Sequence, residues 1–139
     1  MMKGKILGID FGLVRTGIAI TDEMQIIASP LEAVPTKDLQ TYLKKMIPEK
    51  KIVAIVIGEA KRLNGESSPI TESQLKFAAQ VERLFPHIPI HRVNEMFTSK
   101  MATQSLVVSG MKKSERQKKE NIDMVSAAII LQSFLDSPR

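Results

Sequence analysis

Residues 52–57 form an unbroken apolar run, Ile-Val-Ala-Ile-Val-Ile, that ends at Gly58. A strand with one face in water alternates apolar and polar residues, so an unbroken run indicates a strand that is covered on both faces. Such strands lie inside parallel sheets, because the crossover connections between parallel strands place helices over the two faces. The sequence therefore predicts an α/β fold with this segment near the centre of the sheet.

The other segments predict a five-stranded mixed sheet, in the order βββαβαβα, with helices on both faces. Further strands are expected at residues 5–10, 15–21, 24–31 and 88–93, and helices at residues 36–47, 69–86, 98–109 and 121–135. Pro48 is expected to end the first helix, because proline lacks the amide hydrogen that continues a helix. Three strands before the first helix imply an antiparallel start, and the later strand–helix–strand units imply parallel crossovers.

The composition fits one domain and excludes several kinds of site. The chain has 139 residues, 43% hydrophobic and 25% charged, which suits a single globular domain over residues 1–139. It contains no cysteine, so it has no disulfide, no thiolate nucleophile and no cysteine-ligated zinc. The first apolar run ends at Asp10 and is too short for a signal peptide or a membrane span. These features predict a cytoplasmic protein.

The chain is basic, with 20 lysine and arginine residues against 15 acidic ones, a formal charge of +5 and a pI near 9.6. An excess of positive charge favours a polyanionic partner such as nucleic acid. Residues 112–119 hold five cations: Lys112, Lys113, Arg116, Lys118 and Lys119. Because most charged runs are only solvated surface, that alternative stands beside a nucleic-acid contact.

Asp10 closes the first predicted strand, which is apolar on both faces. Ligands of open α/β sheets bind at the C-terminal ends of such strands, so Asp10 is a candidate site residue. The alternative is an aspartate that caps the turn after the strand.

Asp123 lies on the most apolar predicted helix. Ten of the 14 residues from 122 to 135 are apolar, and helical steps from Asp123 reach Ala127, Ile130 and Phe134. An unpaired buried carboxylate costs several kcal/mol, so this residue requires a cation, a metal or hydrogen-bond donors. The alternative is a first-turn aspartate that the helix dipole favours.

Glu95 follows the strand predicted at residues 88–93, and alone it could be a capping acid of the next helix. Strand ends and a helix end can converge at one edge of a sheet, so Asp10, Glu95 and Asp123 can meet there. Such oxygen ligands suit Mg²⁺ or Mn²⁺, which in turn suit phosphoryl transfer. Glu59, after the central run, is either a fourth acid at this edge or an exposed loop residue.

Four groups of residues, in this order and at these separations, are typical of one protein family. They are Gly8-Ile9-Asp10-Phe11-Gly12, Arg15-Thr16-Gly17, Glu95 with Phe97-Thr98-Ser99, and Asp123 with Ser126-Ala127-Ala128-Ile129-Ile130-Leu131-Gln132. Through them nearly the whole chain resembles the YqgF family of pre-16S rRNA nucleases, which are also described as RuvX-type Holliday junction resolvases. The resemblance implies an RNase H-like fold related to RuvC resolvases, with Asp10, Glu95 and Asp123 as metal-binding catalytic acids.

The chain departs from this family pattern at two places. Where the family usually has Asp-Glu-Arg before the Thr-Ser pair, this chain has Asn94-Glu95-Met96, so the glutamate remains while an acid and an arginine are replaced. After the central strand the family usually has Gly-Leu-Pro, whereas this chain has Gly58-Glu59-Ala60. The missing arginine removes one expected contact to substrate phosphate and leaves the three acids in place.

The leading hypothesis is a metal-dependent nuclease that hydrolyses structured nucleic acid, with one or two Mg²⁺ or Mn²⁺ ions on the three acids. Processing the 5′ end of pre-16S rRNA is the expected role, and branched DNA, cut by a homodimer, is the alternative. Arg15, Thr16 and the cations of residues 112–119 are expected to hold the substrate. Two other hypotheses remain: an ATP-handling protein with a phosphate loop after Asp10, and a non-catalytic RNA-binding factor of ribosome assembly.

Overall fold

The computed structural model of the protein describes residues 4–59, 69–94 and 119–136. Its strands are β1 (Lys5–Asp10), β2 (Arg15–Thr21), β3 (Ala28–Pro35), β4 (Ile52–Glu59) and β5 (Ile90–Asn94), and its helices are η1 (Thr36–Asp38), α1 (Leu39–Glu49), α2 (Pro69–Leu84) and α5 (Lys119–Asp136). The strand order is β3-β2-β1-β4-β5, with β1 antiparallel to β2 and parallel to β4. This confirms the predicted five-stranded mixed sheet.

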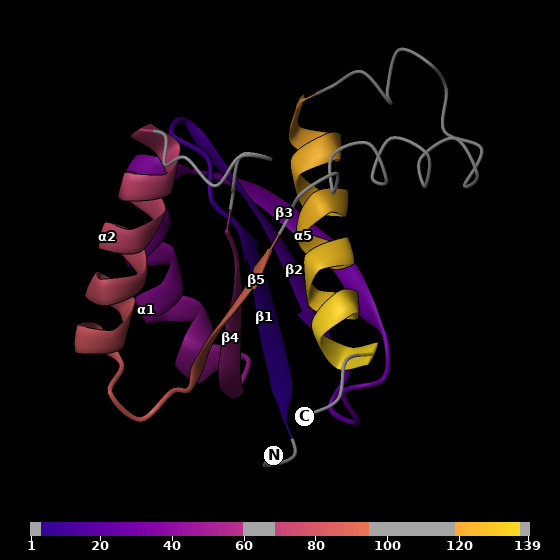
Figure 1. The fold of residues 1–139 in the computed structure, drawn as a ribbon. Helices are drawn as coiled ribbons and strands as arrows, with labels where there is room; N and C mark the ends of the chain where they lie inside the picture. The colour runs from indigo at the N-terminus through magenta and orange to yellow at the C-terminus, as the bar shows by residue number, and fades with distance from the viewer. Residues whose placement is uncertain (1–3, 60–68, 95–118, 137–139) are drawn as a thin grey trace.

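Helices cover both faces of the sheet, with α1 and α2 over one face and α5 across the other (Figure 1). The side chains of β1 alternate between these layers: Leu7 and Ile9 pack toward α1 and α2, whereas Ile6 packs toward α5. The central strand β4 is likewise buried on both faces, with Ile55 and Val56 on opposite sides. The apolar run at residues 52–57 is therefore a strand covered on both faces, as the sequence predicted.

The layers approach most closely where α5 crosses β1 at Gly8. A side-chain carbon at this position would lie 2.7 Å from Cβ of Leu131 and 3.0 Å from the carbonyl oxygen of Ala127. Ser126, Ala127 and Ala128 are all buried, as expected for a helix whose small residues let it pack closely on the sheet. Glycine at position 8 is therefore needed for the observed helix–sheet distance.

The third strand lies four residues later than the sequence predicted, at 28–35 instead of 24–31. The carboxylate of Asp22 explains the difference, because it accepts hydrogen bonds from the backbone amides of Met24 (3.0 Å), Ile26 (3.0 Å) and Ile27 (2.9 Å). These amides point at one side chain instead of a neighbouring strand. Residues 22–27 therefore form a loop, although their apolar residues favour a strand.

Other boundaries differ less. Helix α1 continues through Pro48 to Glu49, two residues beyond the predicted end, and the amide of Lys50 still donates to the carbonyl of Met46 (2.9 Å). Strand β5 begins at Ile90 and not at residue 88, and the carbonyl of Pro89 already accepts the amide of Ile55 (3.0 Å). The helix predicted at 98–109 lies outside the described residues. Within the described residues, no helix combines the length and the apolar character that crossing a membrane requires.

We expect Gly8→Ala to lower the free energy of unfolding by about 1–3 kcal/mol, because the added carbon overpacks the contact with Leu131 and Ala127. Urea unfolding measures this loss. Lys44→Ala, at an exposed position of α1, is the control and should change stability by less than about 0.5 kcal/mol. A Gly8→Ala protein as stable as the wild type would show that α5 can retreat from the sheet freely.

The backbone hydrogen bonds to Asp22, chiefly that from Ile27, lower the pKa of its carboxyl group. A lowered pKa in the folded state stabilises the protein above the unfolded pKa of about 3.9, and this contribution is lost as the pH falls through the folded value. We expect Asp22→Ala to lower the melting temperature at neutral pH and to approach the wild type in strong acid. Glu23→Ala is the matched control, and equal melting curves for Asp22→Ala and wild type at neutral pH would contradict this role.

Candidate active site

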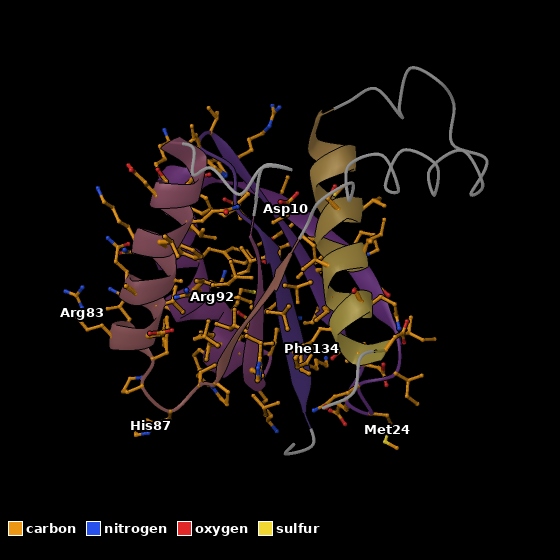
Figure 2. All side chains as sticks on the ribbon, viewed as in Figure 1. Asp10, Met24, Arg83, His87, Arg92 and Phe134 are labelled. Atoms are coloured by element: carbon orange, nitrogen blue, oxygen red, sulfur yellow. The ribbon has the colours of Figure 1, made fainter. Side chains whose placement is uncertain are left out.

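Asp10 ends β1 on the face of the sheet that α5 covers. Ile6 packs among the residues under α5, Gly8 contacts α5 directly, and Asp10 follows after another two residues. Because strand side chains alternate between faces, Asp10 shares the face of these two residues. Its side chain is partly exposed at the end of the sheet (Figure 2).

Glycines flank Asp10 on both neighbouring strands. Gly17 on β2 pairs with Asp10, and on β4 Gly58 follows Ile57, which is the partner of Ile9. Neither position carries a side chain that could fill the space beside the carboxylate. The two neighbouring strands therefore place no side chain directly beside Asp10 on the face that α5 covers.

Helix α5 brings Asp123 toward the same end of the sheet. Gln132, near the end of the helix, accepts the amide of Ala28 (2.9 Å) and donates to the carbonyl of Ile26 (3.2 Å), at the end of the sheet where β1 begins. The helix therefore runs antiparallel to β1, and its first turns lie at the end that holds Asp10, as Figure 1 shows.

The level of Asp123 along β1 follows from the contact at Gly8. Asp123 lies one turn before Ala127, about 6 Å along the helix axis, and Asp10 lies two residues after Gly8, about 6.6 Å along the strand. The backbones at Asp10 and Asp123 are thus at similar heights at one end of the sheet. The side chain of Asp123 lies outside the described residues.

Ser126 adds a buried polar atom to this region of α5. It is 1% exposed, and its hydroxyl has no hydrogen-bond partner among the described residues. Buried hydroxyls are normally hydrogen-bonded, so Ser126 leaves one buried oxygen without a described partner three residues after Asp123.

The connection between β1 and β2 is held in a tight turn. Any Cβ at Gly12 would collide with the backbone carbonyl of Arg15. Thr36 stabilises this turn through two hydrogen bonds. Its hydroxyl donates to the carbonyl of Gly12 (2.6 Å), and its amide donates to the carbonyl of Val14 (2.9 Å). The backbone next to Asp10 is therefore anchored from two directions.

Thr16 belongs to this anchor. Its side chain is 0% exposed, and its hydroxyl shares a 2.9 Å hydrogen bond with the hydroxyl of Thr36. A fully buried hydroxyl cannot reach nucleic acid in this conformation, so the predicted substrate contact at Thr16 is corrected to a structural role.

Arg15 lies on the α5 face of β2, two residues from Gly17 at the end of the sheet that holds Asp10. Its contact with substrate stays a prediction. Leu13 and Val14 in the preceding turn are 57% and 78% exposed, so two apolar side chains face solvent close to the same edge.

Several predicted site residues lie beyond what the structure describes. Glu95 and the cations Lys112, Lys113, Arg116 and Lys118 fall in residues 95–118, and of Glu59, Asp123 and Lys119 only the backbone is described, Lys119 as the first residue of α5. Among the described residues no group of three acidic or histidine side chains is placed to bind a metal. The metal set Asp10, Glu95 and Asp123 therefore stays a prediction.

Two supporting residues were missed from the sequence. Thr36 anchors the turn after Asp10, and Gln74 on α2, 2% exposed, donates to the carbonyl of Phe11 (3.3 Å). Phe11 also stacks on Phe77 of α2, with ring centroids 5.1 Å apart. These contacts join segments 24 to 66 residues apart in the chain, and no local pattern signals them.

Residues 4–137 match the protein-family model described as "RuvX: Holliday junction resolvase". The chain belongs to the RuvX family. A protein from Flavobacterium johnsoniae named "Putative pre-16S rRNA nuclease" is 47% identical over 135 residues, which cover 97% of this chain and 98% of the relative. A protein of the same name from Amoebophilus asiaticus is 42% identical, with 96% and 95% covered. The match confirms the family resemblance and the predicted enzyme class, a nuclease.

Solved structures share the fold of this RuvX chain. Thermus thermophilus RuvC, in complex with a Holliday junction substrate, matches with a TM-score of 0.60 at 13% identity and covers 96% of both chains. The yeast mitochondrial Holliday junction resolvase Ydc2 matches with a TM-score of 0.55 at 11% identity, over 96% of this chain and 78% of the other. At such low identities the likeness establishes the fold alone, and it confirms the predicted RNase H-like fold.

We expect Thr36→Val to destabilise the RuvX chain by about 1–3 kcal/mol, because it leaves the buried Thr16 hydroxyl and the Gly12 carbonyl unpaired. The double variant Thr16→Val with Thr36→Val should be more stable than the single one, since it removes the buried unpaired hydroxyl as well. Urea unfolding of both compares them directly. A double variant less stable than Thr36→Val alone would contradict the shared hydrogen bond.

Proposed function

We propose that this RuvX protein hydrolyses phosphodiester bonds at the sheet edge around Asp10, and that its substrate is the 5′ region of pre-16S rRNA. The observation that carries the proposal is that Asp10 and the first turns of α5 lie at one end of the sheet. We assign Glu95 to the same site because it directly follows, in the chain, Asn94, the last residue of β5. We assign Asp10, Glu95 and Asp123 as the catalytic acids.

The donor set suits Mg²⁺ or Mn²⁺, which bind carboxylate oxygens and water. When bound, such an ion lowers the pKa of a water ligand and neutralises charge that develops on the phosphate. Asp10 holds its carboxylate on a strand end that the anchored turn keeps in place. We assign Arg15, on the same face of the sheet, to a phosphate oxygen of the substrate.

Binding of nucleic acid draws on charge and on the exposed turn. The formal charge of +5 favours a polyanion, and we assign the cations of residues 112–119, including Lys119 at the start of α5, to the phosphate backbone. Leu13 and Val14 offer apolar contacts to sugars or unstacked bases close to Asp10. The relatives named as pre-16S rRNA nucleases favour an RNA precursor as the substrate.

Branched DNA is the second candidate substrate, because the family model is described as a Holliday junction resolvase. A four-way junction has two-fold symmetry, so this activity requires a homodimer that presents two sites. The replacement of an acid and an arginine at Asn94 and Met96 keeps a third interpretation open, an RNA-binding factor that does not cut.

The test is cleavage of end-labelled structured RNA precursor and of four-way DNA, with Mg²⁺ or Mn²⁺ or with EDTA. We expect metal-dependent cutting of the RNA that Asp10→Asn lowers by more than about a hundredfold, since even replacing a residue that only orients a metal ligand costs about 10-fold to 100-fold. Asp136→Asn makes the same change at the far end of α5 and should leave the rate unchanged. If only the DNA is cut, the four-way junction is the substrate. If nucleic acid binds but is not cut, the result favours the RNA-binding factor of ribosome assembly.

Metal binding is tested separately by thermal unfolding. We expect Mg²⁺ or Mn²⁺ to raise the melting temperature of the wild type and to raise that of Asp123→Asn less. Without metal, Asp123→Asn should be neutral or stabilising, because it relieves repulsion among the acids. Equal metal-induced shifts in both proteins would count against a ligand at Asp123.

A further inference from the structure

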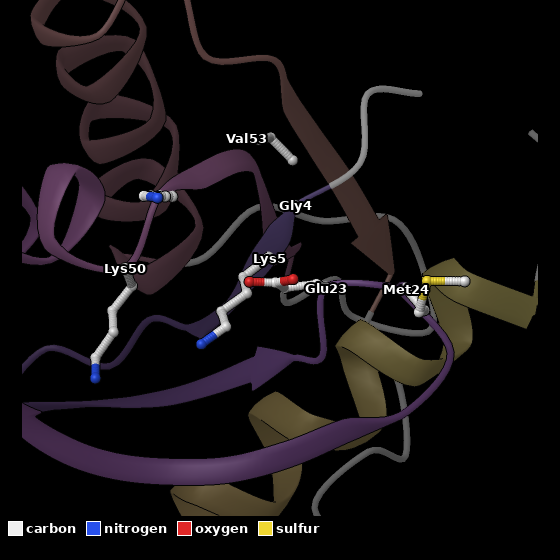
Figure 3. Close-up of a pocket in the computed structure, with 7 residues that line it drawn as sticks. Gly4, Lys5, Glu23, Met24, Lys50 and Val53 are labelled. Carbon is white, nitrogen blue, oxygen red and sulfur yellow. The ribbon is translucent and has the colours of Figure 1, made fainter.

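A pocket of about 430 Å³ lies at the end of the sheet where β1 begins (Figure 3). Its walls include Lys5, Lys50, Lys51, Glu23, Met24 and Val53. Five residue steps along β1 separate Lys5 from Asp10, a distance of roughly 17 Å. Met24 and Asp10 accordingly appear at opposite ends of the molecule in Figure 2, so the pocket is separate from the candidate active site.

Tertiary structure assembles the three lysines of this pocket. The parallel pairing of Lys5 with Ile52 sets the start of β1 beside the residues that follow α1. In Figure 3 the side chains of Lys5 and Lys50 extend in the same direction from these two segments. The helix dipole favours cations at Lys50 and Lys51, just after α1, but it does not explain Lys5 on β1.

The charges of the pocket are not balanced within the described residues. Three lysines face one carboxylate, Glu23, and none of them forms an ion pair with a described acid. Lys5 and Lys50 are partly buried, so their charges are screened less than those of fully exposed lysines. This arrangement attracts an anion.

The backbone around the pocket is held in an unusual conformation. Gly4, Gln25 and Lys51 have φ values of 146°, 60° and 55°, which residues other than glycine rarely adopt. Gln25 donates its side-chain amide to the carbonyl of Gly4 (3.0 Å), and the amide of Gly4 donates to the carbonyl of Glu23 (3.3 Å). These bonds join the segment before β1 to the loop after β2, so the walls are preformed.

An apolar wall stands beside the cations. Met24 is 62% exposed although it is a large apolar side chain, and Val53 lines the same pocket. The volume lies within the range of about 300–1,000 Å³ that is usual for small-ligand sites. We propose that this pocket binds a nucleotide unit, with its phosphate at the three lysines and its base or sugar against Met24 and Val53. The proposal does not depend on nuclease activity, and its failure would leave the site at Asp10 untouched.

The unit has two sources, a free nucleotide or the backbone of a bound RNA, and calorimetric titration with AMP and with a short single-stranded RNA distinguishes them. Titrations in EDTA prevent metal-dependent cleavage. We expect the double variant Lys50→Gln with Lys51→Gln to weaken binding about tenfold, as two partly exposed charge contacts would. The matched control is Lys44→Gln with Lys45→Gln, which removes the same charge from exposed positions of α1 outside the pocket and should change the Kd by less than about twofold.

Glu23→Gln provides the opposite test. Because this carboxylate repels a phosphate, its removal should tighten binding of either probe, whereas a cation-binding pocket would lose affinity. The proposal would be overturned if both double lysine variants weakened the binding of AMP or RNA equally, or if neither probe bound saturably. If AMP binds saturably and RNA binds no more tightly than AMP, the ligand of the pocket is a free nucleotide. Tighter RNA binding, with a salt dependence whose slope falls by about 0.7 for each phosphate that a lysine variant no longer neutralises, assigns the nucleic-acid backbone.

Discussion

The contact between Gly8 and the backbone of α5 determines the position of the candidate active site. It sets both the distance of the helix from the sheet and its level along β1. A shift of α5 by one turn would move Asp123 about 5.4 Å along the strand and out of level with Asp10. Packing at the centre of the helix thus controls the geometry of the acids at its beginning, and a substitution far from the chemistry can affect the chemistry.

The turn after Asp10 shows how the rigid part of the protein and the reactive edge are joined. Thr36 comes from the start of the first helical segment, yet it holds the carbonyl of Gly12 and the hydroxyl of Thr16. Phe11 adds to this support on the same face of the sheet through its stacking on Phe77 of α2. Asp10 is therefore carried by a strand end that the layer of η1, α1 and α2 stabilises, which limits its motion.

The two ends of the sheet have different electrostatic character. At the end that holds Asp10, the proposed group of acids would require cations, and Arg15 is the described cation on the same face. At the other end the lysines around the pocket have no described acid paired with them. If both proposals hold, a long nucleic acid would meet carboxylates with a metal ion at one end and lysines at the other, and these bind phosphate by different means.

The sequence by itself determined the fold class, the family and the identity of the candidate acids. The unbroken run at 52–57 and the apolar last helix are local patterns, and local patterns report directly which segments are buried. Sequence also predicted β1, β2 and α5 nearly to their observed ends. It misplaced β3, because the hydrogen bonds of Asp22 override the strand preference of the apolar residues beside it.

Only the tertiary structure decided what the supporting residues do. The sequence predicted that Thr16 contacts the substrate, whereas in the structure Thr16 is buried against Thr36. Gly17 and Gly58 acquire their role beside Asp10 through strand pairing, and Lys5 joins the other lysines of its pocket in the same way. The physical reason is that burial and distance depend on which segments pack together. A local sequence pattern indicates where each strand or helix lies in the chain, but not which other segments it contacts.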